Sequence, residues 1–147
     1  MKKLKVLLVS APGLDLEDFD RDHNKIRGYG LYPPIQLTIL AGTILKKVEG
    51  TEIEVLDLEF EIRKYFSDNM KSPVTAAEFM EKTIINKIDK FQPDLVGVSV
   101  VFSPAHNNTL TIANIVKEKN PKILVISGGN HATFAYDTML TKCPNID

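Results

Sequence analysis

Four short runs of valine, isoleucine and leucine, separated by longer segments with helical periodicity, constrain the fold of this chain more than any other feature. The runs lie at residues 5–10, 52–58, 95–101 and 122–128. Three of them are almost continuously apolar, as expected of strands covered on both faces of a parallel sheet. The runs therefore predict four parallel strands, each followed by a helix.

The segments between these runs repeat apolar residues every three or four positions, which is typical of helices that pack on a sheet. Prolines at residues 33–34 precede the first repeat, and proline suits the first turn of a helix because no amide donor is needed there. The second repeat opens with Thr75 and Glu78, which are spaced for a capping box. A third repeat ends before Asn120, and a fourth starts near His131. The apolar face of the second repeat consists of Met80, Ile84, Ile88 and Phe91.

The order of these elements predicts one α/β domain over residues 1–147: a doubly wound, Rossmann-like (flavodoxin-like) parallel sheet in a three-layer αβα arrangement. With 147 residues, 44% of them hydrophobic, the chain can bury one core without disulfides. After the fourth helical segment the chain reads CPNID and stops where a fifth strand is expected. We therefore expect a sheet that lacks its last strand, in a domain cut from a longer protein.

Charge and cysteine content exclude several classes of function. The 18 basic and 19 acidic residues leave a net charge of −1, which does not suit a nucleic-acid-binding protein. Cys143 is the only cysteine, so this chain alone can form neither a disulfide nor an iron–sulfur site. The first lysines precede a short apolar run that leads into Pro12 and acids, unlike a signal peptide. We expect a cytoplasmic protein with no membrane partner.

The predicted fold also indicates where a ligand would bind. In a doubly wound sheet, ligands bind beyond the carboxyl ends of the strands, where neighbouring crossovers leave on opposite faces. This rule selects three loops, at residues 10–32, 102–108 and 127–131. The last loop follows a buried strand and contains two glycines, an asparagine and a histidine. Its glycines expose the backbone at the point where a ligand would approach.

Several functions that are known for such sheets fit these loops poorly. A dinucleotide site needs GxGxxG after the first strand, and the string SAPGLD offers only Gly13. A phosphoacceptor domain needs carboxylates at the ends of the first and third strands, and neither strand has one. A hydrolase would need a G-x-S-x-G elbow, which is absent. Flavin mononucleotide stays open as a weaker alternative, although Pro12 donates no hydrogen bond to its phosphate.

Three motifs, in a fixed order, carry a resemblance to a known family. A double proline opens the first helix within residues 31–47. Within residues 93–134, PD-φ-φ-G-φ-S lies on the third strand and φ-φ-GG-x-H-A-T follows the fourth, where φ is an apolar residue. In these segments the chain resembles the amino-terminal cobalamin-binding domain of cobalamin-dependent radical S-adenosylmethionine enzymes. That group includes methyltransferases and the anaerobic magnesium-protoporphyrin ester cyclase.

The resemblance implies that the ligand is cobalamin (vitamin B12), held base-off with its dimethylbenzimidazole tail in the sheet crevice and its corrin ring across the strand ends. The glycines at 128–129 would let the tail approach the main chain. Ser99 and Ser103 would offer hydroxyls to the tail or its phosphate, and residues 130–131 would line the corrin edge. The implied cofactor-binding residues are Ser10, Ala11, Pro12, Ser99, Val100, Ser103, Gly128, Gly129, Asn130 and His131.

Some of these features also suit a purely structural role. A Gly-Gly pair often forms a tight turn into a helix, and Ser103 also suits a helix cap, so both interpretations stay open. The D-x-H-x-x-G motif of methionine-synthase-type cobalamin proteins is absent, because His23 lies five residues before Gly28. No metal ligand is therefore assigned, and His23 is only a candidate for the lower face of cobalt. In the loop after the first strand, which contains His23, a run of acids predicts a mobile, solvated segment: Asp15, Glu17, Asp18, Asp20 and Asp22.

The radical chemistry of the family needs a 4Fe–4S cluster held by CxxxCxxC, and one cysteine cannot hold it. The resemblance thus implies that the cluster and S-adenosylmethionine are bound by a C-terminal radical S-adenosylmethionine barrel of the same parent chain. This chain alone is expected to contribute no catalytic residue. Its predicted function is to bind cobalamin and present it to that barrel for methyl transfer or another radical step. The alternative is a flavodoxin-like nucleotide-binding or interaction domain that no longer binds cobalamin.

Overall fold

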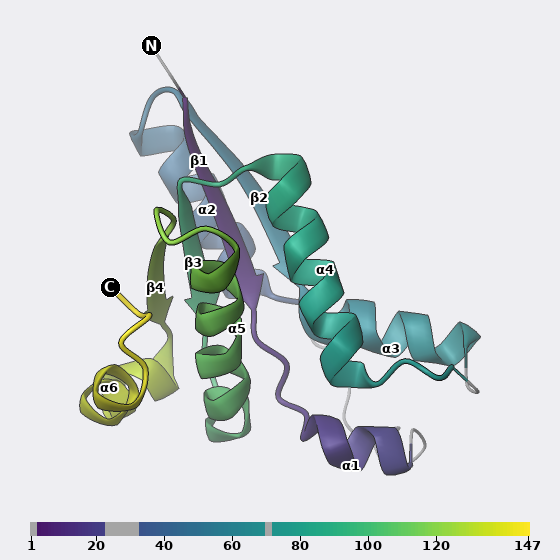
Figure 1. The fold of residues 1–147 in the computed structure, drawn as a ribbon. Helices are drawn as coiled ribbons and strands as arrows, with labels where there is room; N and C mark the ends of the chain where they lie inside the picture. The colour runs from purple at the N-terminus through teal and green to yellow at the C-terminus, as the bar shows by residue number, and fades with distance from the viewer. Residues whose placement is uncertain (1–2, 23–32, 70–71) are drawn as a thin grey trace.

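The computed structural model describes residues 3–22, 33–69 and 72–147. Four strands form one parallel sheet in the order β2–β1–β3–β4. Their arrows all point toward the same end of the molecule (Figure 1). The strands are β1 (Leu4–Ser10), β2 (Thr51–Asp57), β3 (Leu95–Ser99) and β4 (Leu124–Gly128). The parallel α/β fold predicted from the alternating pattern is confirmed.

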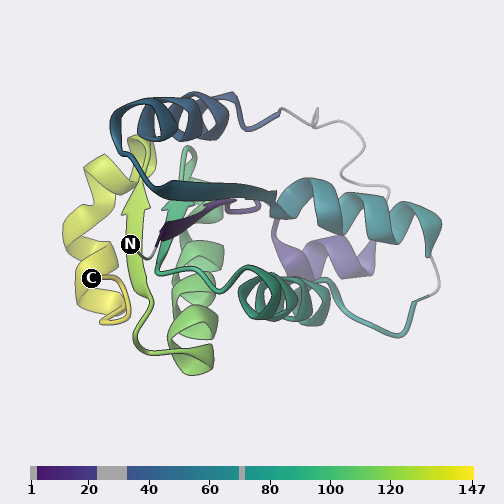
Figure 2. The same cartoon turned by 90° about the horizontal axis from the view of Figure 1, so that it is seen from above.

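Helices cover both faces of this sheet. α2 lies on one face, whereas α4 and α5 lie on the other and α6 packs against α5 and β4 (Figure 2). The shorter α1 and α3 pack against α4. The helices are α1 (Leu16–Arg21), α2 (Ile35–Lys47), α3 (Leu58–Asp68), α4 (Ala76–Phe91), α5 (His106–Lys119) and α6 (Asn130–Lys142), with a 3-10 turn, η1, at Ser103–Ala105. In the described part of the chain, none of them has the length and apolarity that crossing a bilayer requires.

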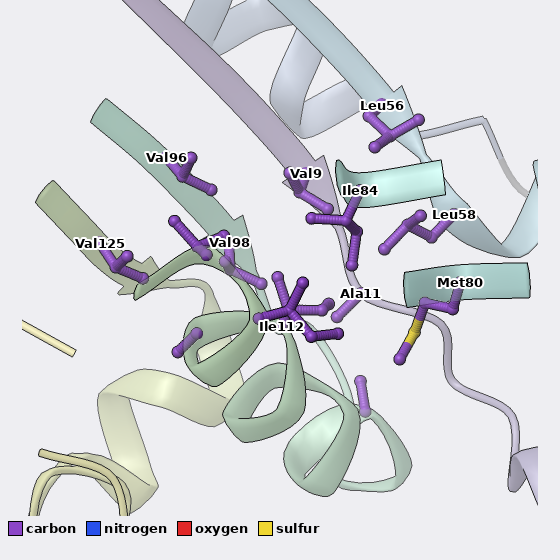
Figure 3. Packing of buried hydrophobic residues seen from close by; sticks show 14 of the residues in the cluster. Val9, Ala11, Leu56, Leu58, Met80, Ile84, Val96, Val98, Ile112 and Val125 are labelled. Carbon is purple, nitrogen blue, oxygen red and sulfur yellow. The ribbon is translucent and has the colours of Figure 1, made fainter. Parts of the chain in front are cut away.

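Two apolar clusters form, one on each face of the sheet. Residues of β1 alternate between them: Leu7 and Val9 belong to the cluster under α4 and α5, whereas Leu8 belongs to the cluster under α2. Figure 3 shows the larger cluster, in which Ile84 of α4 and Ile112 of α5 lie against valines of the sheet. Complete burial of a side chain such as Ile84 contributes about 1.5–3 kcal/mol. This cluster therefore supplies much of the driving force that holds the helices in place.

The predicted capping box is present at the start of α4. Thr75 Oγ1 accepts a hydrogen bond from the Glu78 amide at 3.2 Å, and Glu78 Oε2 accepts one from the Thr75 amide at 3.0 Å. A further acceptor comes from α1, where the Asp20 carboxylate accepts from the Ala76 amide at 2.8 Å. The four residues predicted for the apolar face of this helix are all buried. The start of α4 is thus held both locally and by a distant part of the chain.

We expect Thr75→Ala to lower the free energy of unfolding by about 1 kcal/mol, because the Glu78 amide would lose its acceptor. Urea unfolding of the purified chain measures this loss. Thr111→Ala is the matched control, since Thr111 is an exposed threonine inside α5 whose hydroxyl donates to Asn107 O in the preceding turn. Alanine has a higher helix propensity than threonine, so the control should be as stable as wild type or slightly more stable. Equal losses in the two variants would show that the cap is not what stabilises α4.

The prediction of a loop for the acidic run is wrong, because most of this run forms α1, although Glu17 and Asp18 are exposed to solvent as predicted. Phe19 is buried there and lies edge-to-face with Phe66 of α3, with ring centroids 5.4 Å apart. Asp15 caps the helix, and its Oδ1 accepts from the Asp18 amide at 3.0 Å. Asp20 caps α4. One aromatic anchor and two capping carboxylates order the segment, and hydrophobic periodicity does not register a helix with so short an apolar face.

Two other differences from the predicted elements follow β2 and β3. β2 ends at Asp57, whose carboxylate accepts from the Phe60 amide at 3.2 Å and caps α3, a helix that the sequence pattern did not predict. Partial burial raises the pKa of the Asp57 carboxyl. β3 ends at Ser99, two residues earlier than predicted, because the Val100 carbonyl accepts from the His131 amide at the start of α6. Both strand ends are therefore set by contacts with helix starts.

Candidate functional site

The carboxyl ends of β1, β3 and β4 place a row of small residues side by side. Ser10 pairs in register with Ser99, and Ser99 with Gly128. Strand alternation puts this row on the sheet face that carries α2, since Leu8 and Leu95 of the same strands belong to the α2 cluster. β1 and β3 send their crossovers to opposite sides at this point. The row therefore lies at the position where a doubly wound sheet binds ligands.

On the sheet face behind this row, β3 carries a glycine, Gly97. A Cβ at Gly97 would lie 3.0 Å from Leu8 Cδ2 and 3.7 Å from Ile126 Cγ1, so side chains of the two neighbouring strands close over the glycine. On the same face, Leu124 and Ile126 of β4 are 52% and 46% exposed. Exposed apolar side chains that adjoin one another suit an apolar ligand group or a partner. Two hydroxyls and an open backbone thus border an apolar surface.

The two glycines at the end of β4, Gly128 within the strand and Gly129 just after it, differ in what the fold requires of them. Gly129 has a φ of 108°, and a Cβ there would lie 2.6 Å from the Val100 carbonyl oxygen. The same carbonyl accepts from the His131 amide at 3.1 Å, so this turn is held against the end of β3. At Gly128 a Cβ would meet nothing within 4 Å, and the residue is exposed. The turn itself explains Gly129, whereas Gly128 keeps the space above the sheet free of a side chain.

Three of the predicted site residues have side chains that belong to the framework. Ala11 and Val100 are buried in the large core cluster, and Pro12 is buried as well. The Pro12 carbonyl accepts from Asn108 Nδ2 at 2.8 Å, which ties the loop after β1 to α5. These three residues could contact a ligand through the backbone only. The more accessible members of the predicted set are Ser10, Ser99, Ser103, Gly128, Gly129, Asn130 and His131.

A hydrogen-bonded cluster joins the starts of α5 and α6 at the same end of the sheet. Ser103 Oγ lies 3.2 Å from His131 Nδ1, and His131 Nε2 lies 2.9 Å from His106 Nδ1. Burial lowers the pKa of His106, and the charges of His131 and Lys142 lower it further. The fold thus brings together two predicted residues and adds His106, which was not predicted. Its only signal in the sequence is its place three residues after Ser103, at the start of the same helix.

The helices of this chain fall into two electrostatic groups. α1, α3 and α4 each begin with a side-chain cap and acidic residues in the first turn. α2, α5 and α6 have neither. The amino end of a helix carries partial positive charge and unpaired amides, so an uncapped start favours an anionic group nearby. Because α5 and α6 begin shortly after β3 and β4, two such ends border the row of small residues.

Other parts of the molecule offer fewer features of a site. Within the described residues, no three His, Cys, Asp or Glu side chains are grouped so that they could hold a metal ion. His23, the candidate cobalt ligand, lies outside those residues. Cys143 is buried, and its thiol donates to Asn114 Oδ1 at 3.4 Å. A surface groove of about 500 Å³ lies at the amino ends of the strands, but Lys119 in it is already paired with Asp89 at 2.7 Å.

Comparisons with known proteins identify relatives of this chain. The model of the B12 binding domain family matches residues 26–147. An uncharacterized methyltransferase of Pyrococcus horikoshii is 38% identical over 147 residues, which is 100% of this chain and 26% of that protein. The anaerobic magnesium-protoporphyrin IX monomethyl ester cyclase of Rubrivivax gelatinosus is 31% identical over 118 residues, which is 80% of this chain and 18% of that protein. The chain therefore corresponds to about a quarter or less of the length of these relatives.

Proposed function

Because this chain belongs to the B12 binding domain family, we propose that it holds cobalamin at the carboxyl ends of its strands and presents it to another domain of a longer protein. Family membership confirms the resemblance carried by the sequence motifs and supports cobalamin as the ligand. One observation carries the placement. The row of Ser10, Ser99 and Gly128 borders an exposed apolar face and leaves the backbone open.

The residues along the sheet fit the tail of cobalamin. Ser10 and Ser99 would donate hydrogen bonds to the polar groups of the nucleotide loop, and Gly128 would let that loop approach the main chain. The exposed side chain of Ile126 suits the aromatic surface of dimethylbenzimidazole. Uncapped starts of α5 and α6 favour the negative phosphodiester.

The residues at the helix starts fit the rim of the corrin ring. Ser103, Asn130 and His131 carry polar side chains that can bond the amide groups at the periphery of the macrocycle. The buried framework residues Ala11, Pro12 and Val100 would contribute backbone groups only. When bound, cobalamin would supply a cobalt centre for methyl transfer or a one-electron step. The chain itself would bind, orient and shield it.

We propose further that cobalamin binds base-off, with its tail detached from cobalt and lying along the sheet. An apolar sheet face next to hydroxyl groups would stabilise a detached tail, because it buries the benzimidazole and satisfies the polar loop. The chain lacks D-x-H-x-x-G, so the lower face of cobalt has no assigned ligand. His23 remains a candidate for that position by its chemistry alone.

The proposed partner is a C-terminal radical S-adenosylmethionine barrel of the same parent chain, which would hold the 4Fe–4S cluster and S-adenosylmethionine. Two observations support a further domain: the chain spans 26% and 18% of its two relatives, which are named a methyltransferase and a cyclase. Cys143 is buried and hydrogen-bonded, so this chain would supply no cluster ligand. Phe102 and Phe134, near the starts of α5 and α6, are 70% and 89% exposed and suit a contact with that domain.

We expect the purified chain to bind one equivalent of cobalamin with the spectrum of the base-off form. The experiment is a titration with hydroxocobalamin under reducing, anaerobic conditions, followed by visible absorption and then by gel filtration. A parallel titration with flavin mononucleotide tests the alternative nucleotide-binding function. Co-elution of cobalamin with the protein would support the proposal.

The same titration on the full-length parent separates a weak half-site from a wrong assignment, because a partner domain would bury more of the corrin. Cobalamin retained only by the parent would still place the cofactor in this domain if Gly128→Leu in the parent removed it. Flavin retained in place of cobalamin, or no cobalamin in either protein, would overturn the proposed function.

A further inference from the structure

Two imidazole rings hold the starts of α5 and α6 together. His106 is the first residue of α5, and His131 is the second residue of α6. Their rings are edge-to-face, with an interplanar angle of 88° and ring centroids 5.2 Å apart, and His106 Nδ1 lies 2.9 Å from His131 Nε2. On the other side of its ring, His131 bonds Ser103 of η1. The starts of η1, α5 and α6 are therefore joined through a single imidazole.

The number of protons on the two rings decides whether this contact can persist. A 2.9 Å contact between ring nitrogens needs one N–H donor and one lone-pair acceptor. With both rings neutral, one nitrogen can donate and the other accept. One added proton is tolerated, because an imidazolium still donates to a neutral ring. A second proton turns both facing nitrogens into donors and places two like charges in contact, so the hydrogen bond is lost.

We propose that His106 and His131 form a proton-sensitive latch that closes the helix starts around the cofactor site, so that acidification opens the latch and weakens cobalamin retention. Its effect on cobalamin rests on the proposed function, because His131 stands at the proposed corrin edge. The latch itself is a property of the cobalamin-free chain. In it, His106 is a positioning residue that acts through His131.

The surroundings of His106 set the direction of the pH response. Burial and the positive charges of His131 and Lys142, both on α6, lower its pKa below the ordinary value of 6.5. The folded chain therefore binds the His106 proton less readily than the unfolded chain does. This contribution to stability is complete above about pH 6.5, the ordinary histidine value, and is lost as the pH falls below it. Acidification therefore both opens the latch and lowers the stability of the folded chain.

The cobalamin-free chain provides the first test. We expect NMR titration of the wild-type chain to show His106 gaining its proton at a lower pH than in His131→Gln. In that variant the amide nitrogen can still reach His106, but the neighbouring positive charge is removed. An unchanged His106 titration in His131→Gln would show that the two rings are not coupled, and the latch would be wrong whether or not cobalamin binds.

Retention of cobalamin provides the second test, with methylcobalamin in the dark so that the upper ligand does not exchange. Between pH 7.5 and 5.5 we expect the wild-type Kd to rise about three- to tenfold, the range produced by losing one hydrogen bond. His106→Asn, whose amide can bond His131 but cannot titrate, should keep its Kd within about twofold. His106→Ala should bind methylcobalamin more weakly already at pH 7.5. Recovery of the wild-type Kd in His106→Asn would show that His106 acts through its hydrogen bond to His131 and not through the space its ring fills.

Thr111→Ala is the matched control, since Thr111 lies on α5 but its hydroxyl donates within that helix, to Asn107 O. It should show the full wild-type response to pH. Equal pH responses in wild type and His106→Asn, or a response abolished by Thr111→Ala, would overturn the latch while leaving the proposed function intact. No binding at any pH would instead overturn the proposed function, and the NMR result would then decide the latch alone.

Discussion

Gly128→Leu is expected to abolish cobalamin binding while leaving the stability of the fold unchanged. A Cβ at this exposed position would meet nothing within 4 Å, so the protein itself has room for a side chain. In the proposed complex that room belongs to the tail of cobalamin, which approaches the backbone between Gly128 and Ser99. Overlap with a leucine side chain should weaken binding by at least about a hundredfold, or about 2.7 kcal/mol.

Cobalamin titration measures the binding loss, and urea unfolding of the same protein measures the stability. Gly42→Leu is the control, because a Cβ at Gly42 of α2 also meets nothing within 4 Å but lies away from the strand ends. It should bind as tightly as wild type and be somewhat more stable, since leucine exceeds glycine in helix propensity. If Gly128→Leu binds cobalamin as tightly as wild type, Gly128 is not part of the site and the proposed position of the tail is wrong.

Gly129→Ala is expected to lower the free energy of unfolding by about 2–4 kcal/mol, before any question of ligand arises. The φ of 108° is a backbone conformation that alanine rarely adopts, and the new Cβ would lie 2.6 Å from the Val100 carbonyl oxygen. That oxygen cannot move freely, since it accepts from the His131 amide. In a domain of this size the melting temperature should fall by about 5–15 °C.

Gly50→Ala separates the two causes of this loss. Gly50 also has a positive φ, 71°, but a Cβ there would meet nothing within 4 Å. Its loss should therefore be limited to the backbone contribution, about 1 kcal/mol. Thermal and urea unfolding of both variants give the comparison. Equal losses at the two positions would mean that the close approach of Gly129 to Val100 does not constrain the turn.

The contrast between Gly128 and Gly129 shows what sequence alone could not resolve in the site. In the sequence both stand at the end of the same apolar run and both belong to the motif that indicates the family, so they look equivalent. Only the approach of β3, which brings Val100 against Gly129, assigns one glycine to the fold and leaves the other for a ligand. His106 escaped prediction for a similar reason. Its partner lies on another helix, and no local pattern encodes that contact.

The fold was more accessible to prediction, because strand and helix periodicities are local. The capping box of Thr75 and Glu78 and the buried face of α4 could be read directly from spacing. The missed elements depend on distant groups. α1 is anchored by Phe19 against Phe66, and its Asp20 bonds the first residue of α4. Whether the sheet continues beyond β4 in a longer protein stays a prediction.

The position of β1 inside the sheet has a consequence for the order of folding. β1 is made first, yet Leu4 pairs with Thr51 and Val6 with Leu95, so its neighbours emerge much later during synthesis. Such long sequence separations slow folding, because loops must close before these contacts form. Ser10 pairs with Ser99, and Ser99 with Gly128, only at the end of this process. A nascent chain would thus have no place to capture its cofactor until nearly all of the domain had left the ribosome.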